Sequence, residues 1–267
     1  MKQTNIYESI KVTTEKNTFQ DDSLVIEAPL QININNQPYT IVMRTPGNDI
    51  ELINGLLYAE DIYRNNISLK VELEKTDESF NDIYNVEIPK NYLGNGYLNK
   101  RTLLSVSSCG ICGKKELNDI TVSGDAINNK TSLLHTDIQK MFTIMTNHQY
   151  TFMKTGGSHA CAIFDKNNKF LTCKEDIGRH NAVDKCVGSL RINQQLKEAF
   201  SMFVSGRVSY EIVSKAFFAK IPIIIAVSAC SSLAVDFAKE FGICLIGFSR
   251  KDKMTIYANP QYIQYEY

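Results

Sequence analysis

Hydrophobic and polar residues alternate with a period of two along much of the first third of the chain. Because alternate side chains of a strand point to opposite faces of a sheet, this pattern predicts strands over residues 23–26, 31–34, 39–45, 67–74 and 82–88. Apolar residues recur at helical spacing over residues 48–58, which predicts a helix there. Residues 89–100 are rich in Asn and Gly and predict a loop. This portion is therefore predicted to be rich in strand.

Beyond residue 130 short apolar runs alternate with helical ones. Thr136 and Gln139 have the spacing of a capping box, so a helix is predicted to start at Thr136. The other predicted elements are strands over 159–164, 170–173, 201–204, 221–227, 243–248 and 254–258, and helices over 179–190, 209–218 and 232–241. Short apolar strands that alternate with helices imply a sheet covered on both faces. The predicted fold class is α/β, with a β-rich portion over residues 1–130 and a layered α/β domain over residues 131–267.

The composition sets limits on compartment and partners. Lys and Arg together number 29, as do Asp and Glu, so no global positive field attracts nucleic acid. The N-terminal residues lack the apolar segment of a signal peptide, and the longest apolar stretch, residues 221–229, is too short to cross a bilayer. Seven cysteines in a chain without a secretion signal favour reduced thiols. We therefore expect a cytoplasmic protein that binds neither nucleic acid nor a membrane.

Two of the cysteines, Cys109 and Cys112, form a C-x-x-C motif that is flanked by glycines and followed by Lys114 and Lys115. Nearby cations lower the pKa of a thiol, and the thiolate is the reactive form of cysteine, so the motif favours sulfur chemistry. Half of a structural zinc site and a thioredoxin-like redox motif are the alternatives. The chain has no second C-x-x-C and no H-x3-5-H pair, and the motif follows a long region of mostly strand. Both alternatives are therefore disfavoured, and no zinc is expected.

Polar residues gather where the predicted strands give way to helices, at residues 175–185, 205–209 and 228–232, and a basic run follows the strand before residue 249. In open α/β sheets, ligands bind at the carboxyl ends of strands, where helix N-termini favour phosphate and arginines clamp it. Gly156 and Gly157 form a loop whose amides can face an anion. The alternative for each segment is a solvated turn or a capped helix start.

With these segments identified, the chain resembles the formate dehydrogenase accessory sulfurtransferase family (FdhD). The resemblance is carried by residues 44–47, 107–114, 155–160, 175–185, 205–207 and 247–250. These segments follow the family's order, span roughly residues 25–258, and are specific to the family. The resemblance implies a cytidine-deaminase-like layered α/β domain with an N-terminal β-rich portion, and a homodimer.

The resemblance also implies a function. The family accepts persulfide sulfur from a cysteine desulfurase and transfers it to the molybdenum bis(molybdopterin guanine dinucleotide) cofactor, its bound substrate, which formate dehydrogenase requires. Carried over, Cys109 is the persulfide carrier and Cys112 its partner. The residues implied to hold the cofactor are Gly156, Gly157, His159, Asp176, Gly178, Arg179, His180, Asn181, Asp184, Lys185, Ser205, Gly206, Arg207, Ser228, Phe248, Ser249, Arg250, Lys251, Asp252 and Lys253. The chemistry agrees, because Arg179, Arg207 and Arg250 suit the two diphosphates.

Two other functions stay open from the sequence. A chaperone that only binds the molybdenum cofactor would use the same pocket and partners, and only the two cysteines discriminate it from a sulfurtransferase. A zinc nucleobase deaminase needs a His-Ala-Glu (or Cys-Ala-Glu) sequence followed by Pro-Cys-x-x-Cys. Here His159 and Ala160 are followed by Cys161, so the general acid/base glutamate is missing. The deaminase function is therefore disfavoured.

Overall fold

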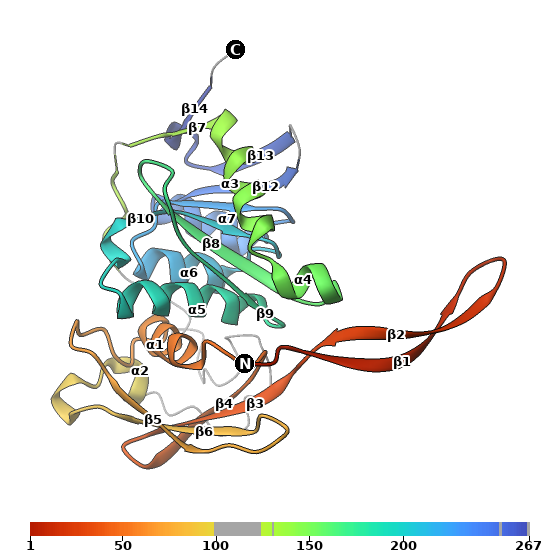
Figure 1. Ribbon diagram of the computed structural model, residues 1–267. Coiled ribbons are helices and arrows are strands. Elements are labelled where there is room, and N and C mark those ends of the chain that lie inside the picture. The colour runs from red at the N-terminus through yellow and green to blue at the C-terminus, as the bar shows by residue number, and fades with distance from the viewer. Residues whose placement is uncertain (99–123, 130, 251–252, 266–267) are drawn as a thin grey trace.

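A six-stranded sheet forms the centre of the molecule in the computed structural model, which describes residues 1–98, 124–129, 131–250 and 253–265 (Figure 1). Its strands are β8 (His159–Asp165), β9 (Phe170–Asp176), β10 (Ala199–Val204), β11 (Ile223–Ala226), β12 (Cys244–Arg250) and β13 (Lys253–Ala258). Their spatial order is β13-β12-β11-β10-β8-β9. β10, β11 and β12 are parallel, whereas β8, β9 and β13 pair with their neighbours in antiparallel fashion. All six strands were predicted from the sequence.

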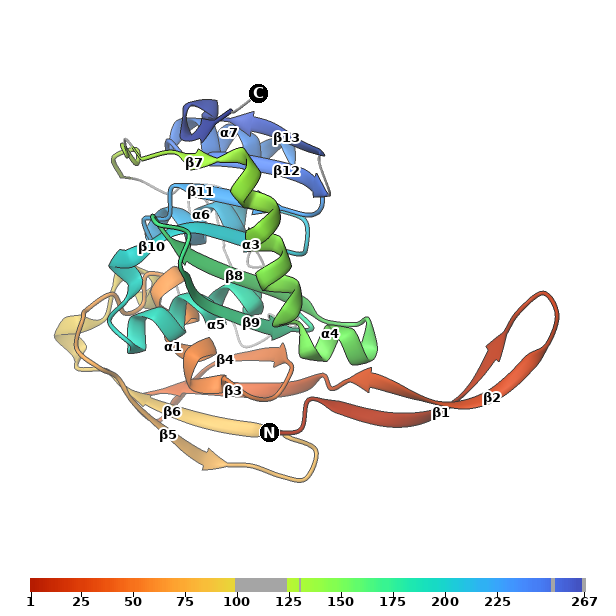
Figure 2. The same ribbon diagram turned by 45° about the horizontal axis from the view of Figure 1, so that its top comes forward.

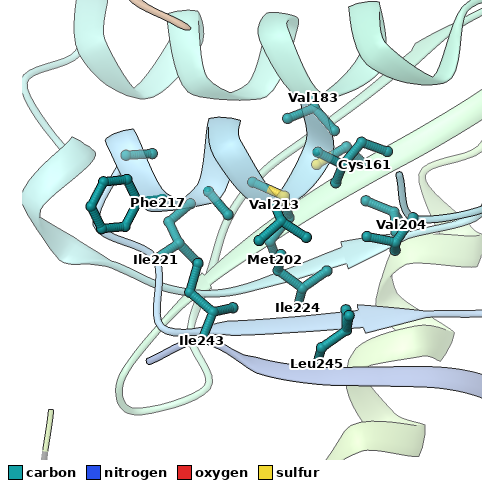
Figure 3. Close-up of a cluster of buried hydrophobic side chains, with 14 of the residues drawn as sticks. Cys161, Val183, Met202, Val204, Val213, Phe217, Ile221, Ile224, Ile243 and Leu245 are labelled. Atoms are coloured by element: carbon teal, nitrogen blue, oxygen red, sulfur yellow. The ribbon is translucent and has the colours of Figure 1, made fainter. Parts of the chain in front are cut away.

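Helices cover both faces of this sheet, as the alternation of apolar strands and helices predicted. α5 (Arg179–Ile192), α6 (Tyr210–Phe218) and α7 (Ser232–Glu240) lie on one face, and α3 (His135–Asn147) lies on the other (Figures 1 and 2). Figure 3 shows the core under α5 and α6, where Met202, Ile224 and Leu245 of the sheet pack with Val183 and Val213. The opposite face of the sheet buries a second cluster around Phe164, Phe203 and Phe142. Strands that are buried on both faces have unbroken apolar sequences, which explains why these strands could be predicted.

The N-terminal part of the chain forms a second sheet with the order β4-β3-β6-β5. Its strands are β3 (Ala28–Ile34), β4 (Gln37–Arg44), β5 (Lys70–Lys75) and β6 (Asp82–Glu87). α1 (Asp49–Ala59), which the sequence predicted over residues 48–58, packs on this sheet through Leu52, Ile53 and Leu57. Its other side contacts α5 (Figure 1).

Two glycines allow the backbones of α1 and α5 to approach closely. A Cβ atom on Gly55 would lie 1.9 Å from the carbonyl oxygen of Asp184, and one on Gly188 would lie 1.8 Å from the carbonyl oxygen of Glu51. Only glycine fits at such a contact. The contact fixes the N-terminal sheet against α5, whose first turn carries Arg179.

A two-stranded ribbon projects from the body of the molecule, and we call it the arm. It consists of β1 (Thr4–Val12) and β2 (Asn17–Val25), which pair in antiparallel register (Figures 1 and 2). The sequence predicted only the end of β2, as a strand over residues 23–26. The rest was missed because the hydrophobic residues of the arm are interspersed with charged ones and do not pack into a core.

The remaining elements are short. They are η1 (Lys90–Tyr92), α2 (Asn95–Leu98), β7 (Leu133–Leu134), α4 (Tyr150–Thr155), η3 (Leu196–Glu198), η4 (Pro260–Tyr262) and β14 (Ile263–Gln264). η1 and α2 occupy a region that was predicted to be a loop. The predicted capping box is also wrong, because α3 begins at His135 after Leu134 and no side chain caps it.

The mixed α/β fold class is confirmed, whereas the cytidine-deaminase-like layering stays a prediction. So does the domain boundary between residues 130 and 131, because residue 130 lies outside the described residues. Within the described ranges, the chain contains no helix with the length and apolar character needed to span a membrane.

Candidate functional site

The turns that the sequence singled out meet at one edge of the six-stranded sheet. The parallel strands β10, β11 and β12 end at this edge, which we call the carboxyl edge. Because β8 is antiparallel to β10, and β9 to β8, strand β8 begins here and β9 ends here. Backbone hydrogen bonds tie the turns together, from Val208 N to the oxygen of Ala229 and from Phe248 N to the oxygen of Ser228, both 3.0 Å. The predicted convergence of the strand-to-helix turns is therefore confirmed.

His159 and two arginines form the first part of this edge. A Cβ atom on Gly206 would lie 3.2 Å from His159 Nδ1 and 3.3 Å from Arg179 Cβ, so the turn after β10 packs between these side chains. Burial lowers the pKa of His159, and the positive charges of Arg179 and Arg207 lower it further. The histidine is thus held towards its neutral form in a positively charged environment.

Arg179 has an unused donor at this place. Its Nε atom is buried and has no hydrogen-bond partner among the residues that the structure describes. Buried donors in proteins are almost always paired, so an unpaired guanidinium nitrogen indicates a place for an acceptor. Ser205 Oγ, which accepts a hydrogen bond from Ala160 N, lies 3.5 Å from His159 Nδ1. This group of residues is suited to bind an anion such as a phosphate.

The ends of β11 and β12 form the second part of the edge. Phe248 has a φ of 50°, in the left-handed region that is costly for a bulky side chain, and its side chain is 48% exposed. Arg250 is exposed and donates from Nε to the oxygen of Val227 at 3.0 Å. Ser249 is buried, and its hydroxyl has no partner among the described residues. Backbone strain at a bulky residue is often kept at functional sites, so Phe248, together with Arg250 two positions later on β12, is a candidate for ligand contact.

Asp176 is fully buried beneath the edge and is hydrogen-bonded to the turn between β9 and α5. Its carboxylate accepts hydrogen bonds from Thr45 N at 3.1 Å, Gly178 N at 2.8 Å and Asn181 Nδ2 at 2.9 Å, and Lys185 Nζ lies 2.7 Å away. Lys185 also donates to the oxygen of Thr45 at 2.8 Å. This network joins the N-terminal sheet to the turn that presents Arg179. Cofactor binding by Asp176, Asn181 and Lys185 stays a prediction, but the Asp176 carboxylate, Asn181 Nδ2 and Lys185 Nζ are hydrogen-bonded within the chain.

Two further predicted residues, Asp184 and His180, also have partners inside the protein. Both oxygens of Asp184 contact Lys215 Nζ, at 2.6 and 2.8 Å. His180 Nε2 lies 3.1 Å from Ser209 Oγ and 3.9 Å from Glu211 Oε2. These pairs bind α5 to α6 and so support the turns from which Arg179 and Arg207 emerge.

Gly156 and Gly157 end helix α4. Gly156 has a φ of 65° and donates its amide to the oxygen of Phe152, and the amide of Gly157 donates to Thr155 Oγ1. Both amides are therefore engaged, and cofactor binding by these glycines stays a prediction. Glu175 belongs to the polar segment 175–185 that the sequence singled out, but no role was predicted for it individually. Its carboxylate accepts hydrogen bonds from the first-turn amides of Thr151 and Phe152.

The two candidate sulfur carriers, Cys109 and Cys112, lie outside the described residues, as do Lys251 and Asp252. Elsewhere burial raises the pKa of cysteine thiols, to about 11 for Cys230 and to about 12 for Cys244. Such thiols are poor nucleophiles at neutral pH. In the part of the chain that the structure describes, no three His, Cys, Asp or Glu residues are placed to hold a metal ion. The expected absence of zinc stays a prediction, because the C-x-x-C motif is not in that part.

Comparisons with known proteins identify the family of this chain. The sequence model of the FdhD/NarQ family matches residues 25–264. A sulfur carrier protein FdhD of Sulfolobus acidocaldarius is 36% identical over 258 residues, covering 95% of this chain and 97% of that protein. One from Mycobacterium tuberculosis is 38% identical over 253 residues, covering 91% and 92%.

A solved structure supports the fold independently. A Desulfotalea psychrophila protein that is assigned as a formate dehydrogenase accessory protein superposes with a TM-score of 0.76. It is 21% identical and covers 98% of this chain and 100% of its own, so the likeness concerns the fold alone. The family match and the curated relatives span nearly the whole chain, and this protein therefore belongs to the FdhD/NarQ family.

Proposed function

We propose that this protein is a cytoplasmic sulfurtransferase that carries persulfide sulfur from a cysteine desulfurase to the molybdenum bis(molybdopterin guanine dinucleotide) cofactor of formate dehydrogenase. The observation that carries the proposal is the C-x-x-C motif of Cys109 and Cys112 in a chain whose relatives are named sulfur carrier proteins. The cofactor is the substrate of this reaction and binds at the carboxyl edge.

The sulfur chemistry follows thiol–disulfide exchange. The Cys109 thiolate attacks the outer sulfur of the desulfurase persulfide, the donor S–S bond breaks, and the donor cysteine leaves as a thiolate. Cys109 then carries a persulfide. Attack of the Cys112 thiolate on the Cys109 sulfur releases the outer sulfur as hydrosulfide towards the molybdenum and leaves a Cys109–Cys112 disulfide. A thiol reductant must supply two electrons to reduce this disulfide before the next cycle.

The geometry of the carboxyl edge supports binding of the cofactor. The cofactor has two guanosine diphosphate ends, and each diphosphate needs cationic donors. On one part of the edge, Arg179 and Arg207 are close enough to His159 for their charges to lower its pKa, and Arg179 Nε, which has no partner among the described residues, can donate to an acceptor. On the other part, the exposed ring of Phe248, two positions before the exposed Arg250, offers a surface on which a guanine base can stack.

A chaperone that only binds the cofactor is the second candidate, because the same edge would serve it. The two functions are separated by loading the protein. Incubation with a cysteine desulfurase and cysteine, followed by intact-mass and peptide mass spectrometry, should show one added sulfur atom on the peptide that contains Cys109. An unloaded protein that still binds the cofactor and activates formate dehydrogenase would favour the chaperone.

A further inference from the structure

Gln3, just before the arm, joins two parts of the molecule that lie far apart in the sequence. Its side-chain Nε2 donates to the oxygen of Pro46 at 3.2 Å, and its Oε1 accepts a hydrogen bond from Thr151 Oγ1 at 2.7 Å. Its backbone oxygen accepts from Ile26 N at 2.9 Å, where the arm returns to the body. Gln3 is half-buried, and Thr151 is buried. Both polar ends of the Gln3 side chain are therefore engaged with the body of the molecule.

The contact with Pro46 leads to the turn that presents Arg179. Pro46 follows Thr45, which is fully buried against the turn between β9 and α5. Thr45 N donates to Asp176 Oδ2 at 3.1 Å, and Thr45 Oγ1 accepts a hydrogen bond from Ile177 N at 3.0 Å. α5 begins two residues after Ile177, at Arg179. The chain at residues 45–46 is therefore one support of the turn from which the Arg179 guanidinium extends.

The contact with Thr151 leads to His159. Thr151 N donates to Glu175 Oε2 at 2.8 Å, and Ser158 Oγ donates to Glu175 Oε1 at 2.6 Å. Ser158 is buried and immediately precedes His159, the first residue of β8. Glu175 therefore holds the start of β8 and the start of α4 together, and Thr151 connects both to Gln3.

We propose that Gln3 is a positioning residue of the carboxyl edge, which sets the separation between Arg179 and His159 by holding the supports of both. This role rests on the proposed function in one respect, that the anion bound by Arg179 is a diphosphate of the cofactor. A binding site loses affinity when the residues that support its ligand-contacting groups are loosened. Arg179 Nε is buried without a partner among the described residues, so its placement decides where an acceptor can bind. Gln3 lies before residues 25–264, which the family model matches.

A purely structural role for Gln3 would have a different consequence. A glutamine that only fastened the base of the arm would lower stability when replaced and would leave Arg179 and His159 in place. The pKa of His159 reports on this relationship, because the charges of Arg179 and Arg207 lower it and the charge of Asp176 raises it. Arg179 has the larger effect of the two charges on the β9–α5 turn. Movement of this turn away from β8 should therefore raise the pKa towards its ordinary value.

The test compares Gln3→Ala with Gln31→Ala in the full chain. Gln31 is also half-buried, and its Nε2 donates to Asn33 Oδ1 at 2.8 Å on the N-terminal sheet. NMR titration of the free proteins should show a higher pKa of His159 in Gln3→Ala than in the parent, and an unchanged pKa in Gln31→Ala. An unchanged pKa in Gln3→Ala would overturn the positioning role, even if that variant is less stable. The titration contains no nucleotide, so its result does not depend on cofactor binding.

Calorimetric titration with guanosine diphosphate gives a second measurement. Gln3→Ala should weaken binding by about threefold to tenfold, the range that corresponds to the loss of one ordinary hydrogen bond. Gln31→Ala should bind like the parent. Equal losses in the two variants would show a general loosening of the fold and would overturn the positioning role. A parent that binds no guanosine diphosphate would refute the nucleotide proposal alone, and the titration of His159 would then decide the role of Gln3.

Replacement of Thr151 tests whether the hydrogen bond between Thr151 and Gln3 carries the effect. Thr151→Val removes the hydroxyl that donates to Gln3 but keeps the backbone amide that donates to Glu175. It should therefore raise the pKa of His159 as Gln3→Ala does, whereas Thr151→Ser restores the hydroxyl and should resemble the parent. The double variant Gln3→Ala/Thr151→Val should be no worse than Gln3→Ala, because both changes remove the same hydrogen bond. A Thr151→Val protein that resembles the parent, or additive effects in the double variant, would overturn the proposal.

Discussion

Lys185 Nζ lies 2.7 Å from Asp176 Oδ2, and neither side chain is exposed to solvent. The pair sits where the N-terminal sheet meets the β9–α5 turn, and Thr45 contributes both a donor and an acceptor to it. Burial of two charges costs free energy that only good geometry and additional hydrogen bonds offset. The Asp176 carboxylate meets this condition, because two backbone amides and Asn181 also donate to it.

Removal of one charge from this pair should be strongly destabilising. We expect Lys185→Met to reduce the free energy of unfolding by about 3–5 kcal/mol, because Asp176 would be left as a buried unpaired charge. Lys140 and Asp137 are also 2.7 Å apart, but the Lys140 side chain is 75% exposed, so Lys140→Met should cost no more than about 1 kcal/mol. Denaturant titration of the two variants measures both values. Equal effects would show that the buried network does not stabilise the fold.

At the contact between α1 and α5, replacing glycine by alanine should lower stability, although helix propensity alone would raise it. At an exposed position inside a helix, Gly→Ala raises the free energy of unfolding by roughly 0.5–1 kcal/mol. At Gly188 the new Cβ would lie 1.8 Å from the Glu51 oxygen, so Gly188→Ala should destabilise by about 1–3 kcal/mol or more. Thr143→Ala, at an exposed position of α3, serves as the control and should change stability by less than about 1 kcal/mol. Thermal denaturation that shows a more stable Gly188→Ala protein would contradict the packing.

The sequence predicted the central sheet well because burial on two faces leaves a strong signal. β11 is a continuous apolar run, β12 begins as one, and α7 between them buries Ala234 and Ala238 on one face. The arm was missed for the opposite reason, since Ile10 and Phe19 pack against nothing in the chain that the structure describes. An element whose apolar side chains are exposed has no core pattern that the sequence could reveal.

The sequence predicted that the polar turns meet at one edge of the sheet. It did not predict which of their side chains are hydrogen-bonded within the chain. Asp176, Asn181 and Lys185 have the residue types of a ligand site. The sequence cannot show that Asp176 and Lys185 contact Thr45, or that Asn181 donates to the oxygen of Met43, more than a hundred positions earlier. Nor can it show that Gly156 and Gly157 use their amides to end a helix. Among the described residues, unused donors at this edge are Arg179 Nε, which lies near His159 and Arg207, and the hydroxyl of Ser249. Tertiary contacts, which the sequence does not show, determine which polar groups remain available to bind a ligand.

The lowered pKa of His159 predicts the direction in which the stability of the protein changes with pH. Burial and the two arginines place it below the ordinary value of 6.5. The unfolded chain therefore binds more protons than the folded one at mildly acidic pH, and the protein should lose stability as the pH falls through and below 6.5. His159→Gln should reduce this loss. Titration of the His159 ring protons by NMR, together with unfolding at several pH values, checks both statements. A measured pKa above 6.5 in the free protein would contradict the site geometry.

Sulfur loading should depend on one thiol. We expect Cys109→Ala to abolish persulfide formation and formate dehydrogenase activation while the fold is unchanged. Cys230→Ala is the matched control, because burial raises the pKa of that thiol to about 11 and makes it a poor nucleophile. Mass spectrometry after incubation with a desulfurase and cysteine measures loading. Full activation by Cys109→Ala would refute the sulfurtransferase function.

Nucleotide binding should be separable from sulfur loading, because the arginines and the cysteines lie on different segments. Guanosine diphosphate reproduces one end of the cofactor and should bind the free protein. A charge-assisted contact to phosphate contributes roughly 1.5–3 kcal/mol, so Arg179→Ala and Arg250→Ala should each weaken binding by tenfold or more. Cys109→Ala should bind like the parent. Lys197→Ala removes an exposed cation just before β10, at the opposite edge of the sheet, and should also have no effect. Calorimetric titration decides, and equal losses in all four variants, or no binding to the parent, would mean that the nucleotide binds elsewhere.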